Sequence, residues 1–351
     1  MEPKPRPALY EAYWQLAAER QAIFHRRVRG DLAPWTADPI LARYKFCNSY
    51  RASDRVSQFL IREVIHGEAA RGLSPEKLFM RVVLFRLFSR PSTWNYLEEA
   101  TGGVGRVDLD VDRLGALLDR IRDTEPIYTS AFILPGHSPF GFHSKHRNHL
   151  ALVDLMFRHD GLGGRIEHAP SLRSVYSMLL EYPTIGPFLA YQIAVDLNYT
   201  EQLQFSENEF TMPGPGAIRG LRKVFLDFGG WSPQRLILHM VDIQETAFAS
   251  LRLPFQNLFG RRLHAIDCQG LFCEVDKYSR VAFPELKSNR VRIKREFAPS
   301  NPAIRLFYPP KWGINAGLQT LGTGNTGSPD INARETSLGR HLRQEQLPIH
   351  A

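Results

Sequence analysis

Cysteine is scarce in this chain. Only Cys47, Cys268 and Cys273 occur among its 351 residues, and no two of them form a C-x-x-C pair. An odd number at these spacings excludes a disulfide scaffold and a four-thiolate zinc site. We therefore expect a reducing compartment, and no residue pattern in the sequence identifies a cofactor.

Long apolar runs are absent as well. No stretch approaches the roughly 18 consecutive apolar residues of a membrane-spanning helix. Residues 1–7 lack the apolar centre of a signal peptide. We expect no membrane partner and an intracellular soluble protein, cytoplasmic in a bacterium or phage-infected cell and nuclear in a eukaryote.

A nucleotide-binding P-loop is the third absence. The motif G-x-x-x-x-G-K-S/T occurs nowhere in the sequence, and the glycine-rich stretch 322–328 has no lysine to reach the β- and γ-phosphates. These 351 residues are therefore not expected to form a self-sufficient kinase.

The residues that are present predict a large, mainly α-helical protein. Hydrophobic residues make up 43% of the chain, and a net charge of +8 favours an anionic partner. Apolar residues recur at helical spacing in most of the chain. The expected helices include residues 8–29, 54–66 with Ser53 as N-cap, 74–88, 112–122, 217–228 and 232–251.

Changes in composition suggest three parts. Residues 1–39 are expected to be an N-terminal helix and linker, and residues 40–308 the main helical domain. Within that domain, alternating cationic and apolar residues at 290–295 suggest an edge strand, the minor β structure of the C-terminal part. Aromatic residues end at Trp312, and glycine, asparagine, threonine and serine dominate from Pro309, so residues 309–351 are predicted to be a disordered tail.

Two glycine-proline turns are each expected to open a helix. In the first, Pro183 ends one helix, Gly186 tolerates a positive φ, and Pro187 begins the next helix. The second turn contains Gly214 and Gly216, and is followed by Arg219 among other cations. Helix N-termini of this kind suit a phosphate group.

A histidine-rich segment follows the middle of the chain. His143, His146 and His149 are spaced to lie along one side of a helix, which is compatible with a metal site. No carboxylate or thiolate accompanies them nearby, so we expect no metal there.

The first turn, residues 182–187, resembles the hairpin of the helix-hairpin-helix DNA glycosylases. Thr184 stands where that pattern has its first glycine, and Phe188 stands where the lyase-type members have lysine. The family's catalytic carboxylate follows the hairpin by about one helix and a loop. Glu207 and Glu209 lie at that distance, and Glu209 is the preferred match.

Three further segments, residues 45–58, 213–220 and 266–278, together resemble the helical domain of the 5-hydroxymethyl-deoxyuridine DNA kinases and the related α-glutamyl/putrescinyl-thymine pyrophosphorylases. The resemblance covers roughly residues 40 to 290. It implies action on a thymine-like base in DNA, at the substituent on ring carbon 5. We call these three stretches the motif segments.

The resemblance and the side-chain chemistry together give the candidate site residues. Lys145 and His146 resemble a Ser-Lys-His element of the family. The candidate catalytic residues are Glu209, Asp276 and Glu274, and the candidate substrate- or DNA-binding residues are Asn48, Tyr50, Arg51, Asp54, Arg55, Lys145, His146, Gly186, Gly214, Gly216, Arg219, Asp267 and Lys277.

Three functions remain open at this point. The first is a transferase that modifies a flipped 5-hydroxymethyluracil, or its phosphorylated derivative, at the 5-methylene. The second is a monofunctional DNA glycosylase. The third is a non-catalytic DNA-binding module that recruits a separate P-loop kinase or another modification enzyme.

Overall fold

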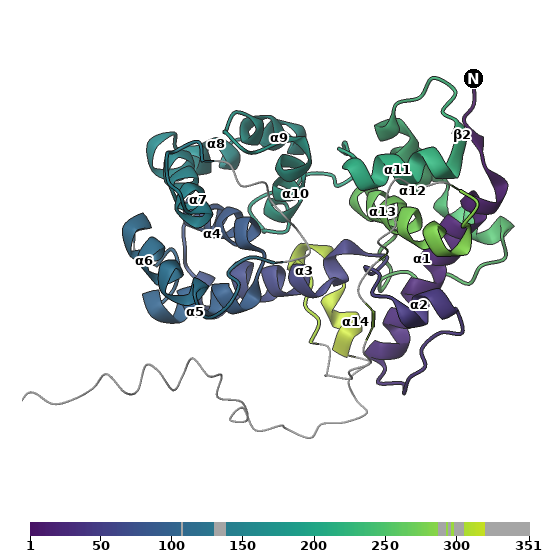
Figure 1. The fold of residues 1–351 in the computed structure, drawn as a ribbon, viewed down its shortest axis with the longest axis horizontal. Coiled ribbons are helices and arrows are strands. Elements are labelled where there is room, and N and C mark those ends of the chain that lie inside the picture. Colours follow the sequence, from purple (N-terminus) through teal and green to yellow (C-terminus); the bar gives the residue numbers. More distant parts are fainter. Residues whose placement is uncertain (107, 130–137, 287–292, 294–295, 298–304, 320–351) are drawn as a thin grey trace, which may run out of the picture.

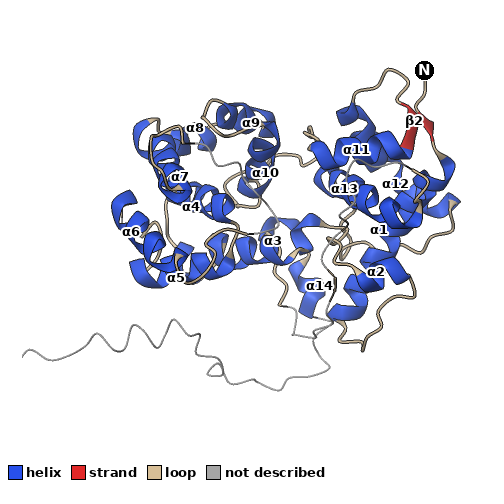
Figure 2. Ribbon diagram, in the orientation of Figure 1, coloured by secondary structure: helices blue, strands red, loops and turns tan. Residues whose placement is uncertain are grey.

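The computed structural model describes residues 1–106, 108–129, 138–286, 293, 296–297 and 305–319, and this part of the chain is mainly helical (Figure 2). The longer helices are α1 (Pro7–Val28), α4 (Pro75–Phe88), α5 (Pro91–Thr101), α6 (Val111–Arg122), α7 (Lys145–Asp154), α9 (Leu172–Leu180), α10 (Pro187–Leu197), α11 (Pro215–Val224), α12 (Pro233–Ser250) and α13 (Ala265–Ala282). The shorter ones are α2 (Pro39–Arg43), α3 (Arg55–Phe59), α8 (Leu162–Glu167) and α14 (Asn315–Gln319), with single turns η1 (Arg51–Ser53), η3 (Glu68–Ala70) and η5 (Pro310–Trp312) and π-helical segments η2 (Leu60–Ile65) and η4 (Leu155–His159).

The helices form two lobes (Figure 1). Helices α4 to α10 make up one lobe, and α1, α2 and α11 to α13 make up the other, with α3 between them. The chain passes from α10 in the first lobe to α11 in the second through residues 198–214. The predicted N-terminal part belongs to the second lobe, because the hydroxyl of Tyr13 on α1 donates to the carbonyl of Cys268 on α13.

Helix α4 is the centre of the first lobe. Every residue from Leu78 to Phe88 is buried, as expected from a run that is apolar nearly all round. The hydroxyl of Ser74 accepts the N–H of Lys77 and caps the helix, and Pro75 occupies its first turn, which confirms the predicted start.

Helix α13 is the centre of the second lobe. It packs against α1, α11 and α12. The approach to α11 is very close, because a Cβ on Gly220 would lie only 1.9 Å from the backbone oxygen of Phe272. Glycine at this position lets the two helix backbones nearly touch.

The predicted helix 54–66 differs from the structure at its start. Ser53 does not cap it: this residue ends the turn η1, and its hydroxyl lies 2.8 Å from the hydroxyl of Tyr308. The helix begins at Arg55 and continues from Leu60 as a π-helical segment. The hydroxyl of Ser53 bonds to Tyr308, a distant residue, instead of capping the helix as local capping rules predicted.

The small sheet lies outside the predicted place. Strand β1 (Lys4–Pro5) pairs antiparallel with β2 (Phe225–Asp227), which ends the helix predicted over 217–228 at Val224. The expected edge strand 290–295 falls almost entirely outside the described residues.

The predicted tail begins inside folded structure. Residues 310–312 form η5, residues 315–319 form α14, and Ile314 is buried. The prediction of disorder is therefore wrong for residues 309–319, and residues 320–351 lie outside the described part of the chain.

Replacing Gly220 by alanine should destabilise the protein by about 1–3 kcal/mol or more, because the new methyl group must push α11 away from the backbone of α13. Gly270→Ala is the matched control, since Gly270 likewise lies inside a helix, α13, and a Cβ there meets nothing within 4 Å. That variant should be neutral or more stable by up to about 1 kcal/mol. Urea unfolding measures both, and equal stability of the two variants would contradict the packing argument.

Candidate functional site

The three motif segments meet on helix α13, which is itself part of the third segment. From the first segment, the N–H of Arg51 donates to Asp267 at 2.8 Å, and the N–H of Cys47 donates to Glu274 at 3.0 Å. From the second, Arg219 pairs with Asp276 at 3.1 Å. Segments far apart in sequence are thus assembled along one helix.

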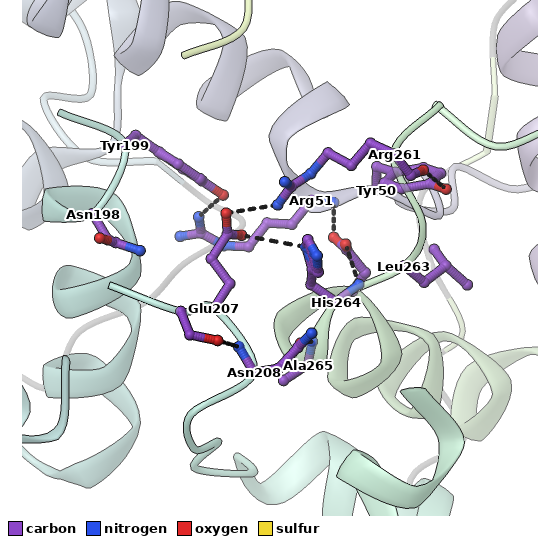
Figure 3. Close-up of polar contacts among 12 residues, drawn as sticks. Tyr50, Arg51, Asn198, Tyr199, Glu207, Asn208, Arg261, Leu263, His264 and Ala265 are labelled. Atoms are coloured by element: carbon purple, nitrogen blue, oxygen red, sulfur yellow. Dashed lines mark hydrogen bonds and ion pairs between the residues drawn. The ribbon is translucent and has the colours of Figure 1, made fainter. Parts of the chain in front are cut away.

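At the N-terminal end of α13, polar side chains from both lobes come together (Figure 3). We call this group the junction cluster. It consists of Arg51, Asp196, Tyr199, Glu207, Arg261, His264 and Asp267.

Arg51 joins the cluster to the first lobe. Its guanidinium donates to Asp196 at 2.7 Å, to the hydroxyl of Tyr199 at 2.9 Å and to Gln192 at 3.1 Å. The other oxygen of Asp196 binds Arg86 from α4. Burial opposes the charge on Arg51, but Asp196 and Tyr199 outweigh it and raise the pKa of the guanidinium. This arginine is held entirely by protein partners.

Glu207 is the partly exposed carboxylate of the cluster. It lies in the segment between α10 and α11, pairs with Arg261 at 2.6 Å, and approaches the imidazole Nδ1 of His264 at 4.0 Å. The side chains of Glu207, Arg261 and His264 are 11%, 12% and 18% exposed, respectively, so each is only partly reached by solvent. The guanidinium of Arg261 also stacks on the ring of Trp312, 3.5 Å from its centroid.

Burial shifts the pKa values of two neighbouring groups in opposite directions. Burial, with help from Arg261, lowers the pKa of His264 to about 4, so its imidazole is neutral at pH 7. Burial raises the pKa of Asp267 to about 6, against the effect of the two backbone N–H groups, of Arg51 and His264, that it accepts. A neutral imidazole beside a carboxylate–guanidinium pair can form a hydrogen bond with a ligand.

Glu209, the preferred catalytic match from the sequence, has a different environment. Its two carboxylate oxygens accept the N–H groups of Leu172 at 3.0 Å and of Arg173 at 3.4 Å. These are the first residues of α9, so the observed role of the exposed Glu209 is to cap that helix. It does not join the junction cluster, whereas Glu207 does.

The two carboxylates predicted on α13 are saturated by cations. Asp276 is fully buried and binds Arg219, Lys223 and Arg280. Burial alone would raise its pKa, but these cations lower it.

Glu274 accepts Lys277 at 2.7 Å as well as the N–H of Cys47. The two carboxylates therefore hold the motif segments together, and Arg219 and Lys277 are their ion-pair partners.

The remaining residues of the first motif segment also make contacts within the protein. Asn48 accepts from Arg20 at 2.7 Å, and its N–H donates to Asp54 at 2.8 Å. Tyr50 is 1% exposed and donates to the carbonyl of Arg261, so its ring is not available to stack on a base. Arg55 is exposed at the start of α3.

The histidine segment forms a separate group in the first lobe. His146 pairs with Asp119 at 2.9 Å, the Nδ1 of His149 lies 3.0 Å from the hydroxyl of Tyr128, and Lys145 lies 4.4 Å from that tyrosine ring. Lys145 and His146 thus lie apart from the junction cluster. Within the described ranges, no group of three or more His, Cys, Asp and Glu side chains is placed to hold a metal ion.

The two glycine-proline turns do begin helices, at Pro187 and Pro215. Gly186, however, has φ −80°, and the positive φ of the first turn falls on Thr184, at +68°. Gly186 therefore does not use the positive φ that glycine tolerates. Gly214 and Gly216 instead give space, since added Cβ atoms would lie 2.5 Å from the Phe188 ring and 3.0 Å from the sulfur of Cys273.

Sequence reasoning missed Asp196, Arg261, His264 and Trp312. Asp196 carried one signal, because it is a single carboxylate in the otherwise apolar run of α10. The other three lie outside the motif segments, and only the fold brings them to Glu207.

Among the described helices, none is long and apolar enough to cross a bilayer.

Comparisons with known proteins agree with the motif segments. Residues 7–288 match the model of the family described as 5-hmdU DNA kinase, helical domain. The chain is 27% identical over 298 residues to a protein of Bacillus phage SP10 named 5-hmdU DNA kinase, covering 79% of this chain and 46% of that protein. The chain thus spans about half the length of this curated relative. No solved structure matches, so the likeness to the glycosylase hairpin stays a prediction.

Asp267→Asn tests the raised pKa. The carboxyl group titrates near 6 when folded and near ~4 when unfolded. Its contribution to stability is therefore greatest below pH ~4 and is lost as the pH rises through about 6. Relative to the variant, the wild-type free energy of unfolding should fall by ~2 kcal/mol between pH 4 and pH 7. Urea unfolding at several pH values measures this, with Asp242→Asn, an exposed carboxylate on α12, as the control. Parallel pH profiles of wild type and Asp267→Asn would contradict it.

Proposed function

Because the chain belongs to the family of 5-hmdU DNA kinase helical domains, we propose that it acts on DNA containing 5-hydroxymethyluracil or its phosphorylated derivative. The reaction we propose is group transfer at the 5-methylene carbon of that base. The observation that carries the proposal is the partly exposed group of Glu207, Arg261 and His264 between the lobes.

DNA backbone contacts are assigned to the two helix starts. The N-termini of α10 and α11 lie next to each other, since Gly214 at the start of α11 packs on the ring of Phe188 in the first turn of α10. Gly186, Pro187 and Pro215 are exposed there. The positive end of each helix dipole suits phosphates, and the net charge of +8 favours DNA.

The base must leave the duplex for this chemistry. The 5-methylene of a paired base faces the major groove, and an enzyme that surrounds the reacting atoms flips the nucleotide into its site. In our proposal the flipped base enters at the partly exposed group of Glu207, Arg261 and His264. Tyr50, buried beneath, supports Arg261 through the backbone instead of stacking on the base.

The junction cluster supplies the groups that displacement needs. The bond between the methylene carbon and the phosphate oxygen breaks, and the phosphate keeps the electron pair. The incoming nucleophile forms the new bond to that carbon and gives its proton to Glu207. Arg261 shares its guanidinium with the leaving phosphate, and the neutral His264 offers a hydrogen bond.

A second candidate is a recognition module that presents the base to a kinase. Two observations favour it: the chain spans 46% of a relative named as a kinase, and its 351 residues contain no P-loop motif. In this case the junction cluster reads the base without changing it. The glycosylase hypothesis differs from both, because a glycosylase releases the free base from DNA.

The deciding experiment is mass spectrometry of nucleosides from DNA with 5-hydroxymethyluracil, or its phosphorylated form, after incubation with the chain and amine donors. We expect a new nucleoside mass. Glu207→Gln should reduce its formation by about 100-fold or more, since the variant cannot accept a proton. Glu209→Gln should have little effect, because the amide oxygen can keep the shorter of the two capping hydrogen bonds, from the N–H of Leu172.

Each other outcome has a clear meaning. If Glu209→Gln abolishes the product and Glu207→Gln does not, the catalytic residue is the one that sequence spacing preferred. Release of free base points to the glycosylase. Unchanged nucleosides with preferential binding of the modified DNA favour the recognition module.

A further inference from the structure

The segment after the family match returns to the junction cluster. The match ends at residue 288, yet residues 307–315 pack directly on Arg261 and on the chain between the lobes. We call residues 307–315 the C-terminal strap. Its composition predicted a tail, but its contacts are those of a folded part of the site.

Trp312 contacts two residues of the cluster. Its ring lies flat on the guanidinium of Arg261, 3.5 Å from the ring centroid to Cζ, and meets Tyr199 edge to face at 5.7 Å. Arg261 is thereby held between Trp312 on one side and the carboxylate of Glu207 on another. Stacking of this kind fixes the plane of a guanidinium and its direction toward the carboxylate.

Lys311 holds the segment that carries Glu207. Its ammonium group donates to the carbonyls of Asn198, Thr200 and Leu203 at 2.5, 3.0 and 2.6 Å. These carbonyls follow the C-terminus of α10, so the three N–H donors of the ammonium group hold the backbone of the loop that leads to Glu207. Burial lowers the pKa of Lys311 to about 8, which leaves it mostly charged at pH 7.

The strap is anchored to α3 and η1 at its start, and its last residue bonds back to that start. The N–H of Phe307 donates to Gln58 at 2.9 Å, and the hydroxyl of Tyr308 lies 2.8 Å from that of Ser53. Asn315 exchanges two hydrogen bonds with the backbone of Tyr308, at 2.9 and 2.8 Å. The strap is therefore tied to the turn that carries Arg51, to the loop that leads to Glu207 and to Arg261.

We propose that the C-terminal strap completes the base-modification site, with Trp312 as the positioning residue that sets Arg261 against Glu207 and Lys311 as the residue that fixes the Glu207 loop. This inference rests on the proposed function for its DNA readout. Trp312 itself touches no reacting atom in the proposal. It acts through the guanidinium that neutralises the leaving phosphate.

The test uses the full chain with Trp312→Ala, the conservative Trp312→Phe, and Trp231→Ala. The last is a matched control, because the guanidinium of Arg235 stacks on Trp231 at 3.8 Å on α12, outside the junction cluster. The DNA-independent readout is the pKa of His264 by NMR titration. Loss of Trp312 frees Arg261 to move away from His264, and the imidazole pKa should rise from about 4 toward its ordinary value.

The DNA readout is the ratio of affinities for duplexes that contain 5-hydroxymethyluracil or thymine at one position. Trp312→Ala should lower this ratio roughly five- to tenfold, as loss of a desolvated cation–π contact would. Trp312→Phe and Trp231→Ala should keep the wild-type ratio and the wild-type His264 titration. A second variant, Lys311→Met, tests the strap if Trp312→Ala fails to fold. Because it removes the bonds to the Glu207 loop, residues 198–209 should show faster backbone hydrogen exchange.

Three outcomes would overturn the proposal. One is an unchanged His264 pKa in Trp312→Ala, and another is a shifted pKa with an unchanged affinity ratio. The third is Lys311→Met with wild-type exchange in residues 198–209. If the wild-type chain itself does not distinguish the two duplexes, the proposed function fails, and the His264 titration alone decides whether Trp312 positions Arg261.

Discussion

The buried carboxylate of Asp196 is the contact on which the arrangement of the lobes depends. Its oxygens bind Arg51, ahead of α3, and Arg86, on α4, and its side chain has no exposed surface. Burying such a charge costs several kcal/mol, which is offset only while its cationic partners stay in place. Three elements are thus fixed relative to one another. Arg51 extends the constraint to the second lobe, because its backbone N–H binds Asp267 on α13.

The helices that could be predicted are those whose cause is local. Helices α4 and α12 each begin at a Ser-Pro pair whose serine caps the helix, and their apolar residues repeat at helical spacing. The two glycine-proline turns likewise predicted the starts of α10 and α11. The mainly helical class and the family resemblance were therefore accessible from the sequence, because neither depends on knowing which helices touch.

The site residues were harder to predict from the sequence, because which side chain belongs to the site depends on its tertiary partner. Glu207 and Glu209 differ by two positions in one loop, but only Glu207 meets Arg261, while Glu209 meets the start of α9. Tyr50 was a candidate substrate- or DNA-binding residue and is buried in the core. Composition marked residues 309–319 as tail, yet they are folded, because Trp312 stacks on a guanidinium and Lys311 donates to three backbone carbonyls.

Dependence on tertiary partners also explains how a neutral imidazole and a carboxylate–guanidinium pair are kept side by side in the junction cluster. His264 stays neutral because burial and Arg261 both disfavour its charge, and Arg261 stays beside it because Glu207 and Trp312 hold the guanidinium from different sides. Each group is oriented before a ligand arrives, so in the reaction that we propose little reorganisation remains to be done when charge develops on a leaving phosphate. The proposed site needs contributions from both lobes and from the strap, and the selectivity for a base that we propose is then a property of the whole assembled junction.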